Sequence, residues 1–228
     1  MLGVLGGMGP LATADFMQKL VRATPSKNDQ NHIPAIVWSV PQVADRSAHI
    51  IYGHEDPYPR LFEGMHRLKS AGACVIAIPC NTAHYWADQL SDAVGLTILS
   101  MADAVAEKVK HLLPEGGTVG LLATDGTVKA NIYQNKLDQK TWPIISPCNK
   151  QQDELMKGIR FAKAGDSVSA KNIFSTQITA LLDQGAERII LGCTELPSVV
   201  EENSLLIDSN SVLAHRCVSW YRANFGLV

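Results

Sequence analysis

Two short motifs, each containing one cysteine, carry the residues of this chain best suited to chemistry. The first is IPCNTAH at residues 78–84, and the second is LGCTELP at residues 191–197. Gly72 and Gly185, each followed by alanine, precede Cys80 and Cys193 at the same distance of eight residues. The repetition predicts one structural unit used twice, with a thiol at the equivalent place in each copy.

Two opposed thiols could work as a paired acid and base. A thiol at a helix N-terminus has a lowered pKa because unpaired N–H groups and the helix dipole favour the thiolate. One sulfur would remove a proton from a carbon centre and the other would return a proton to the opposite face, which is a racemisation or epimerisation. The carbanion needs hydrogen-bond donors aimed at its carboxylate. Candidate donors are the turns at Met8 and Thr124, with Asn81, Thr82 and Thr194 beside the sulfurs.

The cysteines should stand where buried strands end. Apolar, β-branched runs at 73–78 and 188–191 lead into them. Other strands are expected at 2–5, 35–40, 97–100, 118–124, 144–145 and 205–208. Helices are expected at 11–24, 61–70, 82–91, 102–113, 128–137, 152–164, 167–184 and 209–228. Residues 42–60 lack a clear period and are expected to form a long loop of functional importance.

This order predicts an α/β fold of two pseudosymmetric lobes. Strands that alternate with helices indicate a mainly parallel sheet with helices on both faces. We place residues 1–97 in an N-terminal lobe, completed by a C-terminal helix at 209–228, and residues 98–208 in the second lobe. Ligands of parallel sheets bind beyond the carboxyl ends of the strands. The active site is therefore expected in the cleft between the lobes.

Composition excludes several classes of protein. The chain has 228 residues and a formal net charge of −2, so no basic field indicates nucleic acid. No apolar run approaches a membrane span, and a glycine-rich strand begins where a signal peptide would stand, so we expect a cytoplasmic protein. The number of cysteines, five, is odd, which suits free thiols. Cys74, Cys148 and Cys217 lack the repeated context and are interpreted as core or incidental residues.

No metal or cofactor is expected. Cys80 and His84 have a C-x-x-x-H spacing, but no second close pair of ligands joins them, so His84 is interpreted as structural. The Gly-rich turn at 6–9 is a poor dinucleotide fingerprint, and no pyridoxal lysine is evident. The simplest alternative for Cys80 and Cys193 is a pair of small buried apolar residues.

Several motifs together resemble the aspartate racemase branch of the aspartate/glutamate racemase superfamily. They are GGMGPLAT at 6–13, DR at 45–46, PCNTAH at 79–84, LAT at 122–124 and GCTE at 192–195. The resemblance covers essentially the whole chain. It implies a cofactor-independent amino-acid racemase with two pseudosymmetric α/β lobes, usually a homodimer, acting on a small acidic amino acid.

The resemblance also implies roles for individual residues. Cys80 and Cys193 correspond to the catalytic cysteine pair, and Arg46 and Lys163 stand where aspartate-selective members bind the side-chain carboxylate. Met8 and Gln42 complete the predicted substrate contacts, together with Asn81, Thr82, Thr124 and Thr194. The glutamate branch has Asp-Ser-Gly in the first turn and histidine two residues after its second cysteine. This chain has Gly-Gly-Met and Glu195 there, which favours aspartate.

Alternatives stay open at this point. The chain could be a glutamate or broad-specificity racemase, a two-lobed small-acid binding protein with inert cysteines, or an isomerase or decarboxylase that uses one cysteine. Arg46 could pair with Asp45 or Glu55 on the surface, and Lys163 could offset a helix dipole. Glu195 could raise the pKa of Cys193 or orient the start of a helix.

Overall fold

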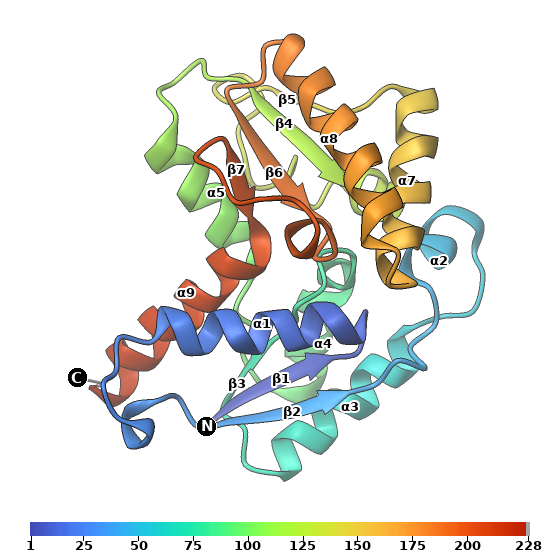
Figure 1. The fold of residues 1–228 in the computed structure, drawn as a ribbon. Coiled ribbons are helices and arrows are strands. Elements are labelled where there is room, and N and C mark those ends of the chain that lie inside the picture. Colours follow the sequence, from blue (N-terminus) through green and yellow to red (C-terminus); the bar gives the residue numbers. More distant parts are fainter. Residues whose placement is uncertain (227–228) are drawn as a thin grey trace.

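In the computed structural model, which describes residues 1–226, the chain forms two lobes, each built on a parallel sheet (Figure 1). In the first sheet, β1 (Leu2–Gly6) lies between β2 (Ala35–Ser39) and β3 (Val75–Ala77). In the second, the order is β5 (Ile144–Ile145), β4 (Val119–Ala123), β6 (Arg188–Gly192) and β7 (Leu206–Asp208). Two parallel sheets flanked by helices confirm the predicted fold class.

The helices cover both faces of each sheet, as the strand–helix alternation predicts. Their bounds are α1 (Pro10–Ala23), α2 (Arg46–Tyr52), α3 (Tyr58–Ser70), α4 (Ala87–Val94), α5 (Met101–Leu112), α6 (Asp125–Lys129), α7 (Asn149–Lys163), α8 (Ser167–Asp183) and α9 (Ser209–Phe225), with short 3₁₀ turns η1 (Asp29–Asn31), η2 (Thr82–Trp86) and η3 (Leu196–Ser198). Apolar side chains of α3 and α4 pack on one face of the first sheet, and those of α1 and α9 pack on the other. In the second lobe, α5 covers one face while α7 and α8 cover the other.

Helix α9 crosses between the lobes. It follows β7 of the second lobe and packs against α1 of the first lobe and against α5 (Figure 1). Residues 227–228 of the predicted final helix lie outside the described residues. The predicted lobe boundary at residues 97 and 98 stays a prediction.

Both cysteines stand at carboxyl ends of strands, as the sequence predicts. Cys193 directly follows β6, and Cys80 lies shortly after β3. The paired glycines upstream share one conformation, since Gly72 has φ 91° and Gly185 has φ 96°. Only glycine adopts this region readily, so the repeated glycine marks the same sharp turn into each cysteine strand.

Some predicted elements were wrong. The expected loop at 42–60 contains α2, which the Asp45 carboxylate caps by accepting the Ala48 N–H at 2.9 Å. The α-helix expected from Thr82 starts only at Ala87, after the 3₁₀ turn η2. The helix expected at 128–137 is replaced by α6, which ends at Lys129, shortly before Asn131 with φ 52°. The strand expected at 97–100 is reduced to one bridge between Ile76 and Ile98.

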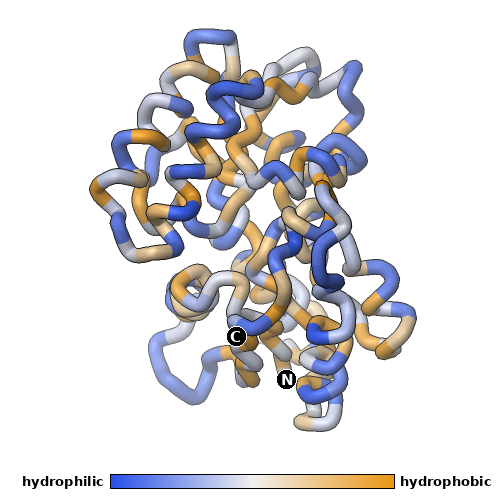
Figure 2. Tube along the Cα trace, turned by 90° about the vertical axis from the view of Figure 1, so that its right-hand side faces the viewer, coloured by the Kyte–Doolittle hydropathy of each residue, from blue (hydrophilic) through white to orange (hydrophobic). Residues whose placement is uncertain are grey.

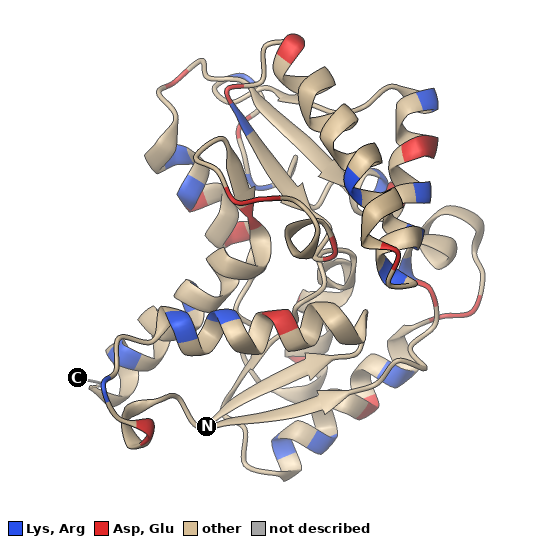
Figure 3. Ribbon diagram, in the orientation of Figure 1, with Lys and Arg blue, Asp and Glu red and all other residues tan. Residues whose placement is uncertain are grey.

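Polar residues lie mainly on the outside of the two lobes and apolar residues lie mainly inside them. In Figure 2, hydrophilic turns lie along the outer rim of both lobes, while hydrophobic segments run through their interiors. In Figure 3, acidic and basic residues are interspersed over the outer helices. Across residues 1–226, every helix is too short or too polar to cross a membrane.

Candidate active site

Cys80 and Cys193 line the same cavity between the lobes, with a volume of about 160 Å³. Each cysteine is 5% exposed. The first lobe and its loops contribute Met8, Asp45, Arg46, Ser47, Asn81 and Thr82, and the second contributes Thr124, Met156, Ile159, Arg160, Lys163, Gly192, Thr194 and Glu195. The structure thus brings together both thiols and most of the predicted substrate contacts.

Gln42 is the exception among the predicted site residues. Its side chain is exposed, and it does not contribute to the lining of this cavity. The chain turns at Pro41 and directs the buried Val43 inward instead. The geometry therefore gives no support to Gln42 as a substrate contact.

The turn after β1 brings Met8 to the cavity because it packs closely against the chain at Val40. Gly7 has φ 95°, and a Cβ built there would lie 2.3 Å from the backbone nitrogen of Val40. The Gly7 N–H also donates to Thr13 Oγ1 at 2.9 Å, which fixes the turn to α1. Glycine is required here because the turn lies directly against the chain after β2.

A ring of three threonine hydroxyls joins the lobes beside the cavity. Thr82 Oγ1 lies 2.9 Å from both Thr124 Oγ1 and Thr127 Oγ1, and the last two lie 3.0 Å apart. Thr124 also caps α6 by accepting the Thr127 N–H at 3.2 Å. Sequence reasoning missed Thr127. Its position three residues after a capping threonine was the available signal.

Asn81 is held by residues far away in sequence. Its amide Nδ2 donates to Ser209 Oγ at 3.1 Å, and its Oδ1 accepts from the Tyr133 hydroxyl. Ser209 Oγ in turn donates to the Leu191 carbonyl at 2.8 Å. Burial raises the pKa of Tyr133, which keeps the phenol neutral and a donor. This network fixes the residue that follows Cys80 to the strand that carries Cys193.

Three cations face the cavity, although sequence analysis predicted only Arg46 and Lys163. Arg160 lies three residues before Lys163 on α7, so both reach the same side of that helix. Among residues 1–226, none of the three forms an ion pair with a carboxylate. Arg46 instead donates to the carbonyls of Val43 and Ala44, at 3.2 and 3.0 Å. The alternative that Arg46 pairs with Asp45 or Glu55 is therefore wrong.

Asp45 keeps its charge beside these cations. Burial tends to raise the pKa of this carboxyl, but the Ala48 N–H and the charges of Arg46 and Lys163 together lower it below its usual value. The cavity wall thus carries Arg46, Arg160 and Lys163 against the carboxylates of Asp45 and Glu195. The excess of positive charge suits an anionic ligand.

Cys193 does not have the lowered pKa that its expected position at a helix start suggested. Its Sγ donates to Glu195 Oε2 at 2.9 Å. Burial and the Glu195 charge raise the pKa of Cys193 well above its usual value, although the Lys163 charge opposes them. The following 3₁₀ turn, η3, has only three residues and so provides little dipole. Of the two readings of Glu195, the structure supports a raised pKa of Cys193.

His84 has a structural role, as predicted. Its Nδ1 lies 2.9 Å from the Cys80 carbonyl oxygen, and its Nε2 accepts the Met101 N–H at 3.0 Å. Burial lowers the pKa of His84, so the ring is neutral with its proton on Nδ1. Within the described part of the chain, no group of three His, Cys, Asp or Glu residues could hold a metal ion.

Comparison with known proteins places this site in context. The Broad specificity amino-acid racemase RacX of Bacillus subtilis is 26% identical over 234 residues, which cover 98% of this chain and 99% of RacX. The structure of the Picrophilus torridus aspartate racemase superposes with a TM-score of 0.83 at 30% identity, covering 93% of this chain and 90% of that chain. A glutamate racemase of Francisella tularensis in complex with D-glutamate shares the fold, with a TM-score of 0.66 at 20% identity, covering 100% of this chain and 82% of that chain. A family model for Asp/Glu/Hydantoin racemase matches residues 5–217, and the chain therefore belongs to this family.

Proposed function

We propose that this protein racemises aspartate without a cofactor, with Cys80 and Cys193 as the two acid–base groups. The observation that carries the proposal is one small cavity lined by both thiols and by three cations that have no carboxylate partner among residues 1–226. A racemase of amino acids follows from membership of the family. The choice of aspartate and of a thiol pair is our inference from the site.

The chemistry needs one thiolate and one thiol. The thiolate removes the α-proton, so a new S–H bond forms and the electron pair of the C–H bond stays on the substrate as an enolate. The opposite thiol then gives its proton to the other face of the α-carbon and keeps the S–H electron pair. The product has inverted configuration, and the roles of Cys80 and Cys193 are exchanged.

Hydrogen-bond donors on the walls would stabilise the developing enolate. Thr82, Thr124 and Thr194, which carry hydroxyl groups, line the cavity, and Asn81 adds an amide. The network through Tyr133 and Ser209 holds the amide of Asn81 in place. Donors that are fixed before the reaction stabilise charge without having to reorganise during it.

The cations favour a substrate with a second carboxylate. Arg46, Arg160 and Lys163 can receive the distal carboxylate of aspartate while the neutral donors hold the α-carboxylate. The wall has three cations against two carboxylates, an excess of one positive charge before the thiolate is counted, so the distal carboxylate has partners of opposite charge.

The test is racemisation in deuterated water with no cofactor added. L-Aspartate should become D-aspartate with deuterium at the α-carbon, observed by proton NMR and chiral chromatography. Cys80→Ser and Cys193→Ser should each lower kcat by at least about 10³-fold, because one base is lost in each case. Wild-type rates in either variant would disprove the two-thiol mechanism.

A broad-specificity racemase is the second candidate, because Met156 and Ile159 give the cavity an apolar side. A panel of aspartate, glutamate, alanine, methionine and lysine distinguishes the two. Aspartate should have the highest kcat/KM. Equal kcat/KM for methionine and aspartate would favour the second candidate.

We also propose that the protein is a homodimer. Light scattering on the purified chain tests this.

A further inference from the structure

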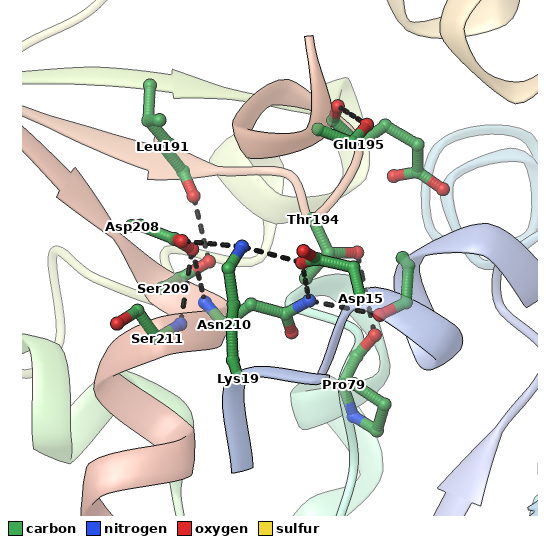
Figure 4. Close-up of polar contacts among 12 residues, drawn as sticks. Asp15, Lys19, Pro79, Leu191, Thr194, Glu195, Asp208, Ser209, Asn210 and Ser211 are labelled. Carbon is green, nitrogen blue, oxygen red and sulfur yellow. Dashed lines mark hydrogen bonds and ion pairs between the residues drawn. The ribbon is translucent and has the colours of Figure 1, made fainter. Parts of the chain in front are cut away.

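Glu195 is a buried carboxylate that lies at the sulfur of Cys193. It is 4% exposed, and its Oε2 accepts the Cys193 thiol proton at 2.9 Å. Its other oxygen, Oε1, is fully buried and has no hydrogen-bond partner. Figure 4 shows the Glu195 side chain directed away from the polar cluster of Asp15, Lys19 and Asp208. An unpartnered buried carboxylate oxygen is costly, which calls for an explanation beyond packing.

Glu195 borders two cavities. Besides lining the cavity of the cysteines, Glu195 lines a neighbouring cavity of about 350 Å³ at the turn that contains Gly9. A Cβ built on Gly9 would lie 3.1 Å from Glu195 Oε1, so this oxygen lies against the turn. Glu195 thus connects the reacting thiol with a second, wider cavity.

We propose that Glu195 is the proton partner of Cys193, so that the thiol and the carboxylate share one proton and act as a single acid–base unit. The inference rests on the proposed racemase mechanism, which requires Cys193 to serve as a base. Burial and the Glu195 charge raise the pKa of the Cys193 thiol, so losing this proton to water is unfavourable. Transfer of the Cys193 proton to Glu195 Oε2 avoids the cost of a second buried negative charge, because the total charge of Cys193 and Glu195 stays at minus one.

The proton steps balance. The S–H bond of Cys193 breaks and an O–H bond forms at Glu195, while the electron pair stays on sulfur. The thiolate then takes the α-proton of the substrate, and Cys80 protonates the opposite face. Cys80 is now the thiolate and Glu195 holds a proton, so the starting state returns when Glu195 releases its proton and Cys80 takes one up. Glu195 also lines the neighbouring cavity, which gives its proton a way out.

Other charged groups face this pair and set its surroundings. They are Asp45, which caps α2, Arg46 at the start of α2, and Arg160 and Lys163 from α7, together with two titratable groups, Cys80 across the cavity and Tyr133 behind it. Lys163 is the one whose charge opposes the rise of the Cys193 pKa. A proton shared within the pair keeps its net charge constant, so these neighbours do not need to rearrange when it moves.

The experiment measures alkylation of Cys193 by iodoacetamide against pH, in the absence of substrate, with peptide mass spectrometry. Only the thiolate reacts. In the wild-type protein the rate should be nearly flat from about pH 6 to about pH 7.5, because the shared proton sets the thiolate fraction. In Glu195→Gln the rate should rise about tenfold per pH unit, since the thiol must then lose its proton to water. The matched control is Glu201→Gln, an exposed carboxylate paired with Lys171, which should keep the flat profile.

A wild-type rate that rises about tenfold per pH unit would overturn the proposal, as would a flat profile in Glu195→Gln. If that variant does not fold, the wild-type profile alone decides the question. In racemisation, Glu195→Gln should lower kcat by about 10²-fold. Alkylation needs no turnover, so the two proposals can fail separately. If the protein does not racemise aspartate but its alkylation profile is flat, the proposed function is disproved and the proposal of a shared proton stands.

Discussion

At the residue scale, the charge of Lys163 acts both on a carboxylate of the cavity wall, Asp45, and on the Cys193 thiol. This charge lowers the pKa of Asp45 and opposes the rise at Cys193. Replacing Lys163 should therefore affect both the binding of the distal carboxylate and the thiol. We expect Lys163→Met to lower kcat/KM for aspartate by about 10²-fold, as expected for loss of one charged contact of about 3 kcal/mol.

The matched control is Lys157→Met on the same helix, which removes an exposed lysine paired with Glu154. Its kcat/KM should stay within about twofold of wild type, because exposed ion pairs contribute little. Alanine, which lacks the distal carboxylate, should lose less activity than aspartate in Lys163→Met. Equal losses for both substrates would mean that Lys163 does not bind that carboxylate.

The two thiols of the site were predictable from sequence, but the residues that support them were not. Cys80 and Cys193 could be found because their motifs repeat with the same spacing from a glycine. Thr127 had only a local capping signal, and its contact with Thr82, like that of Tyr133 with Asn81, crosses between the lobes. No local pattern records a contact between residues that are remote in sequence.

At the element scale, close packing of α7 and α8 positions the cationic side of the cavity. A Cβ built on Gly158 would lie 2.7 Å from the ring of Phe174. We expect Gly158→Ala to lower the free energy of unfolding by about 1–3 kcal/mol, because the two helices must move apart. Urea denaturation followed by circular dichroism measures the change. Lys157→Ala, at an exposed position of α7, should stay within about 0.5 kcal/mol of wild type. A stable Gly158→Ala protein would show that the contact can relax without cost.

The second prediction at this scale concerns His84, which connects η2 with the start of α5. Burial lowers its pKa in the folded state, so below pH 6.5 the unfolded chain binds the extra proton more readily. Stability should fall as the pH drops below about 6.5 and be fully present above it. We expect His84→Gln to flatten this dependence in urea titrations between pH 7.5 and 5.5. An unchanged slope in the variant would assign the effect to other groups.

The sheets and long helices could be predicted because their patterns are strong, whereas the short elements could not. Helix α2 has only seven residues and lies in a polar segment. Its only signals in the sequence were Asp45, which caps its start, and Gly53, which ends it with φ 67°. The turn after Cys80 is the 3₁₀ helix η2, and α4 begins only at Ala87. Short elements depend on caps and tertiary contacts more than on periodicity.

At the scale of the whole molecule, a buried ion-pair cluster links the lobes away from the thiols. Lys19 on α1 lies 2.6 Å from Asp15 Oδ2 and 2.6 Å from Asp208 Oδ2 at the end of β7 (Figure 4). The Lys19 side chain is 11% exposed and that of Asp208 13%. Asn210 adds a bond from its Nδ2 to Asp15 Oδ2 at 2.9 Å. The cluster holds α9 against α1, and so the second lobe against the first.

Lys19→Met should destabilise the protein by about 3 kcal/mol, because two carboxylates lose their cation in a largely buried place. Lys171→Met is the control, since it breaks an exposed pair with Glu201 and should cost less than about 1 kcal/mol. Thermal unfolding of both variants provides the comparison. Equal effects would show that the cluster does not hold the lobes together.

The central claim is that one acidic amino acid lies between Cys80 and Cys193, and a crystal structure with aspartate bound tests it most directly. We predict that the α-carbon lies between the two sulfur atoms, about 3–4 Å from each, with the distal carboxylate toward Lys163. Aspartate bound with both sulfurs on the same side of the α-carbon, or outside this cavity, would contradict the account.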